Sequence, residues 1–335
     1  MTEPLGEAVL VLTNRLDSTA DLVVEHLNDR GVPVFRCDTA EFPTELTLTA
    51  TLADRWAGVL DDGHRTLDLA RVRSVYFRRP EEFRLPDGMS EAGRRFAAAQ
   101  SRAGFVGVAV SLPCLWINHP ARDADANHKP WQLAVARRLG LDPPRSIITN
   151  DPGAARSFAA DLGAPVITKS LGAPVDTVVI DPTQLDDSVR LCAHLFQEWI
   201  DKAHEVRLTV VGDRFFPVEI HAGSAAARVD WRTDYRSLTY RPTAVPAPVR
   251  EQVSAFMREF GLVFGAFDFI VTPAGDWRFL EVNPNGQWSW IEHRTGVPIS
   301  HAIADLLEKG STDEGHPDRH RGSGARPARR TRESP

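Results

Sequence analysis

Apolar and polar positions alternate in short blocks over the first third of the chain. Residues 9–12 are apolar and predict a strand, residues 21–30 have the apolar spacing of a helix, and Gly31 is placed to end that helix. Residues 34–37 predict a second strand, which gives the order strand, helix, strand. Residues 1–118 therefore predict an open α/β domain. Its other elements are expected as strands at 46–52 and 73–77 and a helix at 92–110.

After Asn118-His119-Pro120 the blocks become shorter, and residues 119–195 predict a small α+β unit. Residues 196–309 predict a last sheet and a final helix. Residues 310–335 contain almost no large apolar side chain, so we expect a disordered tail. In the small unit we expect helices at 124–139 and 152–162, strands at 146–149, 165–169 and 177–180, and a mobile loop at 170–174. Segments 191–200, 206–211 and 215–221 should enter the last sheet. The final helix should span 298–308.

Two apolar blocks near the end of the chain are joined by a Pro/Gly turn and predict a β-hairpin. If the hairpin is centred on Ala274 and Gly275, Asp268 lies directly opposite Glu281, and Asn283 points to the same face as Glu281. Two facing carboxylates repel each other, so positive charge should lie between them. Three oxygen donors on one rigid face suit Mg2+, with bound phosphates completing its shell. The alternative is a solvated acidic end of the hairpin.

The composition excludes several classes of protein. A chain of 335 residues with 42% hydrophobic residues is long enough for two or three domains with sizeable cores. The formal net charge of −6 gives no support for nucleic-acid binding, and no apolar run is long enough to span a bilayer. Residues 1–7 lack the pattern of a signal peptide. Cys37, Cys114 and Cys192 show no metal-type spacing, which favours a reducing cytoplasm.

Only four of the 39 basic residues are lysines, namely Lys129, Lys169, Lys202 and Lys309. A compact ammonium can approach a phosphate where a planar guanidinium does not fit. We therefore interpret Lys129, at the start of a predicted helix, and Lys169, at the end of a predicted strand, as phosphate contacts. The alternatives are a solvated helix cation and a strand-end surface charge, and Lys309 is an ordinary helix-end cation.

These two lysines, the acidic linker at residues 196–200 and the carboxylate hairpin resemble the ATP-grasp fold. The chain is more specifically similar, over about residues 8–308, to the ATP-grasp ribosomal peptide maturases, which are the graspetide or microviridin-type macrocyclases. The segments that carry this second resemblance are Val75-Tyr76-Phe77-Arg78-Arg79-Pro80, residues 118–150, residues 197–212 and Asp230-Trp231-Arg232.

The resemblance implies an N-terminal open α/β pre-ATP-grasp domain (1–118), a lid-bearing central subdomain (119–195) and a C-terminal catalytic subdomain (196–309). Such enzymes use ATP and Mg2+ to phosphorylate an Asp or Glu side chain of a ribosomally made precursor peptide. A Ser or Thr hydroxyl, or a Lys amine, of the same peptide then attacks the acyl phosphate and closes an ester or amide ring. The resemblance also suggests a homodimer, while the charge, the cysteines and the lack of a long apolar run predict a cytoplasmic protein that binds neither nucleic acid nor membrane.

The family's residue roles can be carried over by position. Three of these roles have alternatives. The linker at residues 196–200 could pack in the core rather than bind adenine, and Glu205 could form a surface ion pair with Lys202 or Arg207. Asp230 could simply orient Arg232. The implied nucleotide residues are Lys129, Lys169, Glu198, Trp199, Ile200 and Glu205; the metal ligands are Asp268, Glu281 and Asn283; the catalytic residues are Arg207, Arg232 and Lys169; and the peptide contacts are Arg78, Arg79 and Asp230.

Some positions depart from this scheme or stay open. Arg78 and Arg79 follow a predicted strand, where open α/β sheets bind ligands, but they could be ordinary solvated arginines. The loop after Lys169 contains only Gly172 where the family usually has a more glycine-rich lid. Four histidines have no readable partner and are expected to be structural rather than general bases, namely His119, His128, His204 and His221.

Two other functions share these features. A ligase of the ribosomal-protein glutamate ligase type would need the same nucleotide residues but would add an amino acid to a carboxylate. A non-catalytic nucleotide- or peptide-binding module would keep the fold without the reaction. The intact lysines and carboxylates argue against loss of catalysis.

Overall fold

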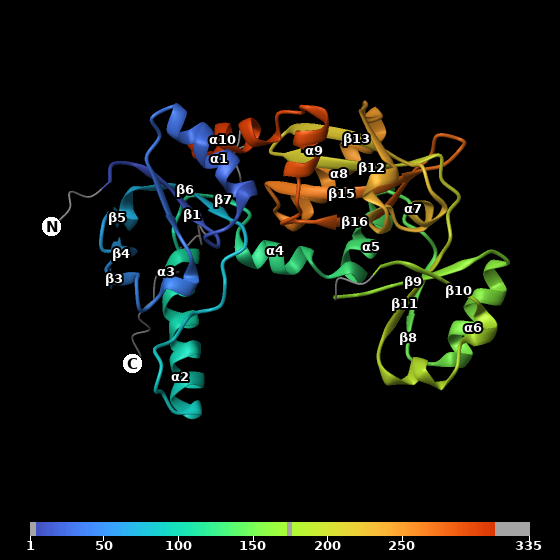
Figure 1. Cartoon of the computed structure of the whole chain (residues 1–335), viewed down its shortest axis with the longest axis horizontal. Coiled ribbons are helices and arrows are strands. Elements are labelled where there is room, and N and C mark those ends of the chain that lie inside the picture. Colours follow the sequence, from blue (N-terminus) through green and yellow to red (C-terminus); the bar gives the residue numbers. More distant parts are fainter. Residues whose placement is uncertain (1–4, 173–175, 312–335) are drawn as a thin grey trace, which may run out of the picture.

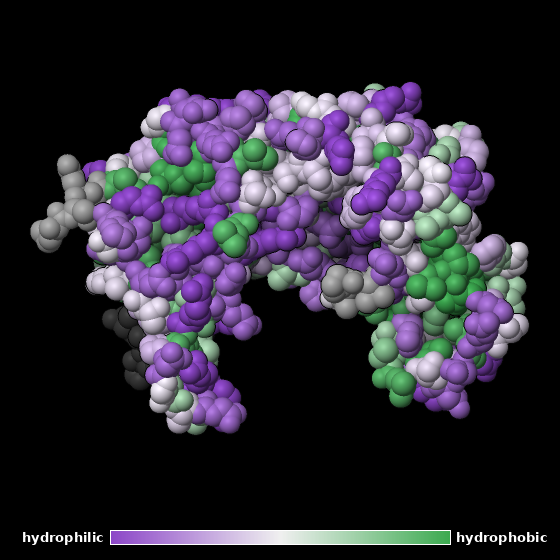
Figure 2. All heavy atoms as spheres, in the orientation of Figure 1, coloured by the Kyte–Doolittle hydropathy of each residue, from purple (hydrophilic) through white to green (hydrophobic). Residues whose placement is uncertain are grey.

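The computed structural model describes residues 5–172 and 176–311 (Figure 1). A parallel sheet lies at one end of the molecule, a five-stranded sheet in the middle and a small four-stranded sheet at the other end. Helix α2 (Glu91–Ser101) and the small sheet project from the same side of the body, so the molecule is shaped like an arch (Figure 1). Figure 2 shows that the body and the α2 side of the hollow are largely hydrophilic, whereas apolar atoms gather on the small sheet at the other side. Most of the tail predicted at 310–335 lies outside the described residues.

Within the described ranges, no helix combines the length and the apolar character needed to cross a lipid bilayer.

The N-terminal sheet is parallel throughout, in the order β2-β1-β6-β7, as the open α/β prediction requires. Helix α1 starts at Ser18 because the Asp17 carboxylate accepts hydrogen bonds from the amides of Thr19 and Ala20, at 3.1 and 3.2 Å. Between β2 and β6 the chain forms a separate antiparallel sheet, of which only the first strand was predicted. The bounds are β1 Ala8–Leu12, α1 Ser18–Asp29, β2 Val34–Cys37, β3 Thr47–Leu52, β4 Trp56–Asp61, β5 Thr66–Asp68, β6 Val72–Phe77 and β7 Leu115–Ile117. The predicted helix at 92–110 is α2, a π-helical stretch (Arg102–Val106) and α3 (Gly107–Val110).

Two of our predictions for the middle of the chain are wrong. The helix expected at 124–139 is interrupted at Asn127 and His128 and forms two helices. The segment at 191–200 does not enter the last sheet, because β11 pairs with β8 and β9 of the small sheet, whose order is β10-β9-β11-β8. The bounds are α4 Pro120–Ala126, α5 Lys129–Arg138, β8 Ser146–Thr149, α6 Pro152–Leu162, β9 Val166–Lys169, β10 Val178–Ile180 and β11 His194–Glu198.

The last sheet is antiparallel, in the order β14-β13-β12-β15-β16. Helix α8, which was not predicted, packs its buried Val253 and Phe256 in one apolar cluster with Val206 and Phe267 of the sheet. Helix α10 reaches back to the N-terminal domain, where the hydroxyl of Ser74 donates to the Leu307 carbonyl at 2.7 Å. The bounds are β12 His204–Val211, β13 Arg214–Ala222, α7 Ala225–Val229, β14 Leu238–Pro242, α8 Ala247–Phe260, β15 Phe264–Val271, β16 Trp277–Asn283, α9 Ser289–Thr295 and α10 Ile299–Lys309.

Candidate active site

The hairpin of β15 and β16 brings the predicted carboxylates together, although its tip differs from the prediction. Near the turn Val271 pairs with Trp277, one residue out of the expected register. A β-bulge at Leu280 inserts one residue into β16, and beyond it Asp268 pairs with Glu281 as predicted. The bulge therefore restores the facing carboxylates on a single face of the sheet.

Protein cations neutralise this carboxylate pair. The guanidinium of Arg232 lies between the two groups, with Nη2 3.4 Å from Asp268 Oδ2 and 3.5 Å from Glu281 Oε1. Lys129 Nζ lies 3.1 Å from Glu281 Oε2, and Arg207 Nε lies 3.2 Å from Asp268 Oδ1. The expectation of positive charge between the two acids is therefore confirmed.

The two carboxylates differ in how firmly they are ionised. Burial raises the pKa of Asp268 above its usual value, and the nearby charge of Glu281 acts in the same direction, against the pull of Arg207 and Arg232. Burial also acts to raise the pKa of Glu281, but Lys129, Lys169 and Arg232 outweigh it, and the pKa is lowered. Glu281 is therefore the more firmly charged member of the pair.

A pocket between the small sheet and the last sheet adjoins these carboxylates. It is lined by residues of β9, of the linker after β11, of β12 and of the hairpin, which are segments far apart in the sequence. Burial lowers the pKa of Lys169 at its wall. The lining residues include every implied nucleotide residue except Lys129; they are Pro144, Ile167, Lys169, Thr177, Glu198, Trp199, Ile200, Lys202, Glu205, Val229, Asp230, Arg232, Ile270 and Leu280.

The structure narrows the implied adenine contacts. The amide of Glu198 donates to the Arg145 carbonyl and the amide of Trp199 donates to the Pro165 carbonyl, both at 2.9 Å. These two donors are therefore engaged within the protein. The implied adenine contacts are therefore reduced to the other backbone groups of Glu198, Trp199 and Ile200.

Lys202 is a pocket residue that the sequence analysis considered only as an ion-pair partner. Its ammonium is hydrogen-bonded to the Glu205 carboxylate and lies 5.9 Å from the ring centre of Trp199. The pair was weighed as a surface feature, but the two side chains are only 10% and 9% exposed. The sequence offered a sign of its importance, because Lys202 is one of only four lysines in the chain.

Asp230 holds Arg232 in place. Its Oδ1 accepts from the Arg232 amide at 3.1 Å and from Arg232 Nη1 at 3.3 Å, and its Oδ2 accepts from the Thr177 amide at 3.1 Å. Burial opposes ionisation of Asp230, yet the hydrogen bonds from Thr177 and Arg232 lower its pKa. Both oxygens are thus engaged, which favours the orienting role over direct contact with a peptide.

Arg207 combines deep burial with unused donors. Its side chain is 5% exposed, and its guanidinium lies 5.7 Å from the ring centre of Trp231 and 5.9 Å from that of Trp290. Among the described residues, Nη1 finds no hydrogen-bond partner, and Nε approaches Asp268 without the alignment of a hydrogen bond. A buried guanidinium with a free N–H is suited to receive an anion.

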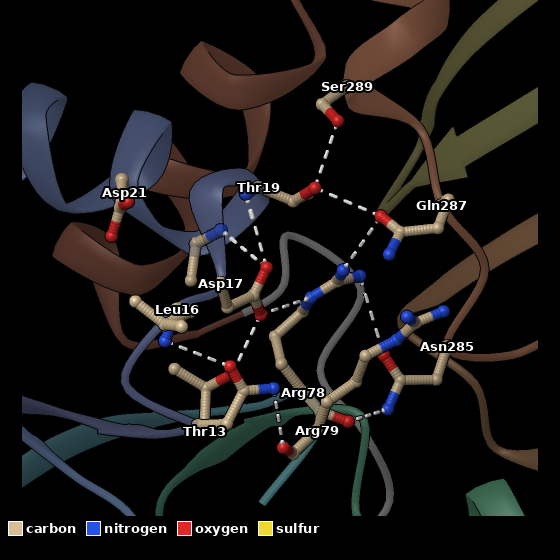
Figure 3. A network of polar contacts seen from close by, with 12 residues as sticks. Thr13, Leu16, Asp17, Thr19, Asp21, Arg78, Arg79, Asn285, Gln287 and Ser289 are labelled. Carbon is tan, nitrogen blue, oxygen red and sulfur yellow. Dashed lines mark hydrogen bonds and ion pairs between the residues drawn. The ribbon is translucent and has the colours of Figure 1, made fainter.

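Arg78 is neither solvated nor open to a ligand. Its side chain is buried, with Nε 3.4 Å from Asp17 Oδ2 and Nη2 3.2 Å from Gln287 Oε1 (Figure 3). Nη1 donates to Asn285 Oδ1 at 3.4 Å and to the Gly286 carbonyl at 3.3 Å. Arg78 thus joins the N-terminal sheet to the loop that follows β16.

Arg79, the next residue, is exposed. Of the two arginines it is the one whose charged group can reach a bound peptide.

The structure gives all four histidines partners that the sequence did not reveal, and their structural role stays a prediction. His119 accepts from the Ala121 amide at 3.3 Å, and His128 contacts the Asp125 carbonyl at 3.2 Å, both within their own helical turns. His204 and His221, in contrast, share the carboxylate of Glu219 as a partner.

Similarities to known proteins agree with this geometry. A family model described as the MvdD pre-ATP grasp domain matches residues 8–124. The macrocyclase MdnC from Microcystis aeruginosa MRC, solved with its precursor peptide MdnA, is 33% identical; the match covers 91% of this chain and 100% of MdnC, with a TM-score of 0.80. The RiPP-associated ATP-grasp ligase from Chryseobacterium gregarium, solved with ADP and a leader and core peptide, is 26% identical over 90% of this chain and 96% of that chain, with a TM-score of 0.81.

The ATP-grasp ligase PsnB, solved with a minimal precursor, Mg and ADP, is 26% identical over 92% of this chain and 98% of PsnB, with a TM-score of 0.75. No curated protein sequence matches the chain.

Proposed function

Because this chain belongs to the ATP-grasp macrocyclases that mature ribosomally made peptides, we propose that it closes rings between side chains of a precursor peptide. The enzyme is an ATP-grasp ligase that uses ATP and Mg2+. An Asp or Glu carboxylate of the peptide is activated as an acyl phosphate, and a Ser or Thr hydroxyl or a Lys amine of the same peptide attacks it.

The observation that carries this proposal is the carboxylate pair beside the pocket. Asp268 and Glu281 face each other at one register position, and Arg232 reaches both of them from the wall of the pocket. A nucleotide held in the pocket would present its phosphates at the end where cations and carboxylates meet. Phosphoryl transfer depends chiefly on such positioning and charge stabilisation.

The carboxylate pair also fits a divalent ion. Asp268, Glu281 and Asn283 offer hard oxygen atoms, the donor type that Mg2+ prefers, and the sheet fixes their spacing. When bound, Mg2+ would neutralise phosphate charge beside the cations of the protein. Asn283 pairs with Ala266, which lies two positions from Asp268 on β15. We assign Asn283 to the metal because it lies on the same face of the sheet as Glu281.

The side chains around the pocket divide the work of the reaction. We assign Lys129 and Lys169 to the phosphate oxygens of ATP and Glu205 to the ribose hydroxyls. The backbone of Trp199 and Ile200 holds the adenine.

Arg207 and Arg232 stabilise the phosphoryl group as it passes to the peptide carboxylate. The bond between the β- and γ-phosphates breaks, ADP leaves and the acyl phosphate forms. The hydroxyl or amine then attacks the acyl phosphate and phosphate is released. The proton of the attacking group passes to solvent. The buried Trp231 beside both arginines excludes water from the acyl phosphate.

The peptide partner is expected at the hollow of the arch, whose body and α2 side are largely hydrophilic, with Arg79 as a contact for acidic residues (Figure 2). We also expect the enzyme to act as a homodimer. Arg78 and Asp230, which were expected to touch the peptide, are assigned to holding the site together.

A mass measurement tests the proposed function. The full chain is incubated with ATP, Mg2+ and the acidic precursor encoded beside it. The peptide should lose one water for each ring closed, and ADP should appear in equal amount. A gain of mass would instead identify a ligase that adds an amino acid. An unchanged peptide, with ATP bound to the protein, would contradict the proposal.

A further inference from the structure

A second cluster of metal-ligand side chains lies on the opposite face of β12 from the pocket. Glu205 lines the pocket, and because strand residues alternate, His204 points to the other face. The register pairs Glu205 with Ile220 and Val206 with Glu219, so His204 lies opposite His221. His204, Glu219 and His221 therefore project from one face of two paired strands.

The geometry of these side chains fits a single ion. His221 Nε2 lies 2.8 Å from Glu219 Oε2, and His204 Nε2 lies 3.9 Å from Glu219 Oε1. One ligand atom from each residue lies within 4.8 Å of the others, and the two imidazole centres are 5.0 Å apart. Zinc bonds of about 2.0–2.2 Å at tetrahedral angles place donor atoms roughly 3.5 Å apart, so small rotations of the side chains suffice.

We propose that His204, Glu219 and His221 bind a transition-metal ion of the Zn2+ class. Two imidazoles and one carboxylate form a three-residue zinc ligand set that leaves a fourth position for water. Mg2+ and Ca2+ prefer sites made wholly of oxygen atoms. The imidazole nitrogens therefore distinguish the metal preference of this site from that of the site at Asp268 and Glu281.

The charge states of the cluster suit a metal. Burial lowers the pKa of His204, which favours the neutral imidazole that ligates metals. Burial opposes ionisation of Glu219, but hydrogen bonds from His221, Thr243 and Arg241 lower its pKa to about 2.

Arg241 is the competing partner of the carboxylate. Its Nε and Nη2 donate to Glu219 Oε2 at 3.0 and 2.7 Å, while Oε1 is turned toward His204. We assign Oε1 to the ion and Arg241 to the hydrogen bond that a ligating carboxylate commonly receives. The Arg241 side chain is 70% exposed, so solvent screens its charge while it keeps this hydrogen bond.

A similar trio elsewhere is already engaged in other contacts. The ligand atoms of His26, Glu292 and His301 also lie within 4.8 Å of one another, but His26 Nε2 contacts the Ser300 hydroxyl at 3.0 Å. Both oxygens of Glu292 accept hydrogen bonds from Ser300. This trio therefore serves as the control.

The test measures zinc binding rather than turnover. The full chain is stripped of metal, kept free of nucleotide and Mg2+, and titrated with ZnCl2 against a coloured zinc indicator. His221→Gln keeps a hydrogen-bond donor toward Glu219 but removes the imidazole, and His301→Gln is the matched control. The wild type and H301Q should take up one more zinc ion than H221Q, or bind it at least about tenfold more tightly.

Thermal unfolding gives a second readout. ZnCl2 should raise the Tm of the wild type and H301Q but not that of H221Q, because the ion joins β12 to β13 only in the folded state. Equal zinc uptake by the wild type and H221Q, or a loss in H301Q alone, would overturn the proposal. If H221Q does not fold, His204→Gln is measured in the same way, with the same outcomes.

Discussion

Arg78 and Asn285 hydrogen-bond to each other in both directions, although 207 positions separate them in the sequence. The guanidinium of Arg78 donates to the amide oxygen of Asn285, and the amide nitrogen of Asn285 donates to the backbone carbonyl of Arg78 (Figure 3). Asn285 comes two residues after Asn283, the end of β16. The N-terminal domain thus fixes the loop that leaves the carboxylate hairpin.

Replacing Asn285 with alanine should weaken this junction. The change removes the hydrogen bond to the Arg78 backbone carbonyl and one of the two acceptors of Arg78 Nη1, which costs about 1–3 kcal/mol. We expect the free energy of unfolding in urea to fall by that amount and the Mg2+ concentration needed for half-maximal turnover to rise. Arg79→Ala, at the exposed neighbour, should change stability by no more than about 0.5 kcal/mol. Equal stabilities for the two variants would show that the junction contributes nothing.

Glu281→Gln should remove Mg2+-dependent turnover. The substitution keeps the size of the side chain but loses the charge that faces Asp268, so release of ADP should fall at least about 100-fold. Glu259→Gln is the matched control, because Glu259 forms only a surface pair with Arg138. The rate of ADP release is measured over a range of Mg2+ concentrations. An unchanged dependence in E281Q would rule out the metal assignment.

Arg207→Lys should lower kcat more than it changes the KM for ATP. Lysine keeps the positive charge but loses the planar group that lies against Trp231 and Trp290 and its free N–H. We expect a fall of about 100-fold in kcat from initial rates. Arg214→Lys, on the surface beside Asp305, should have wild-type rates. A change confined to KM would place Arg207 in binding rather than in transfer.

Glu219 should make stability depend on pH in acid. Its pKa is about 2 in the folded protein against 4.5 for an unperturbed glutamate, so its stabilisation is complete above pH 4.5 and is lost as the pH falls toward 2. A difference of this size corresponds to at most about 3 kcal/mol, and the exposure of Arg241 reduces it to roughly 1–2 kcal/mol.

The measurement compares the wild type with Glu219→Gln. Between pH 5 and pH 3 the free energy of unfolding should fall less steeply in E219Q, with Glu251→Gln on the exposed side of α8 as the control. Parallel curves for wild type and E219Q would contradict the assigned pKa.

The carboxylate hairpin could be predicted because its pattern is local. Alternating apolar residues and one Pro/Gly turn place Asp268 against Glu281, and no distant contact is needed. The bulge at Leu280 could not be predicted. Near the turn the strands pair one residue out of the predicted register, and the bulge offsets this difference, so that Asp268 pairs with Glu281 as predicted.

Some of the predictions that were wrong depend on partners distant in the sequence. The burial of Arg78 depends on Asp17 and on the loop after β16, and nothing around Arg78 reveals either of them. The strand β11 has the same apolar pattern whichever sheet it joins, since pairing rather than periodicity decides that choice. His204 gains Glu219 as a partner only when β12 and β13 pair, whereas Glu219 and His221 lie two residues apart on β13.

Helix α10, the last helix within the described residues, covers the first sheet. Ile303 and Leu307 of α10 are buried in one apolar cluster with Val9 and Val11 of β1 and with α1 (Figure 1). During synthesis these strands leave the ribosome long before α10 does, so part of their apolar face stays uncovered until residue 309 has emerged. The domain that is made first is therefore among the last to be completed.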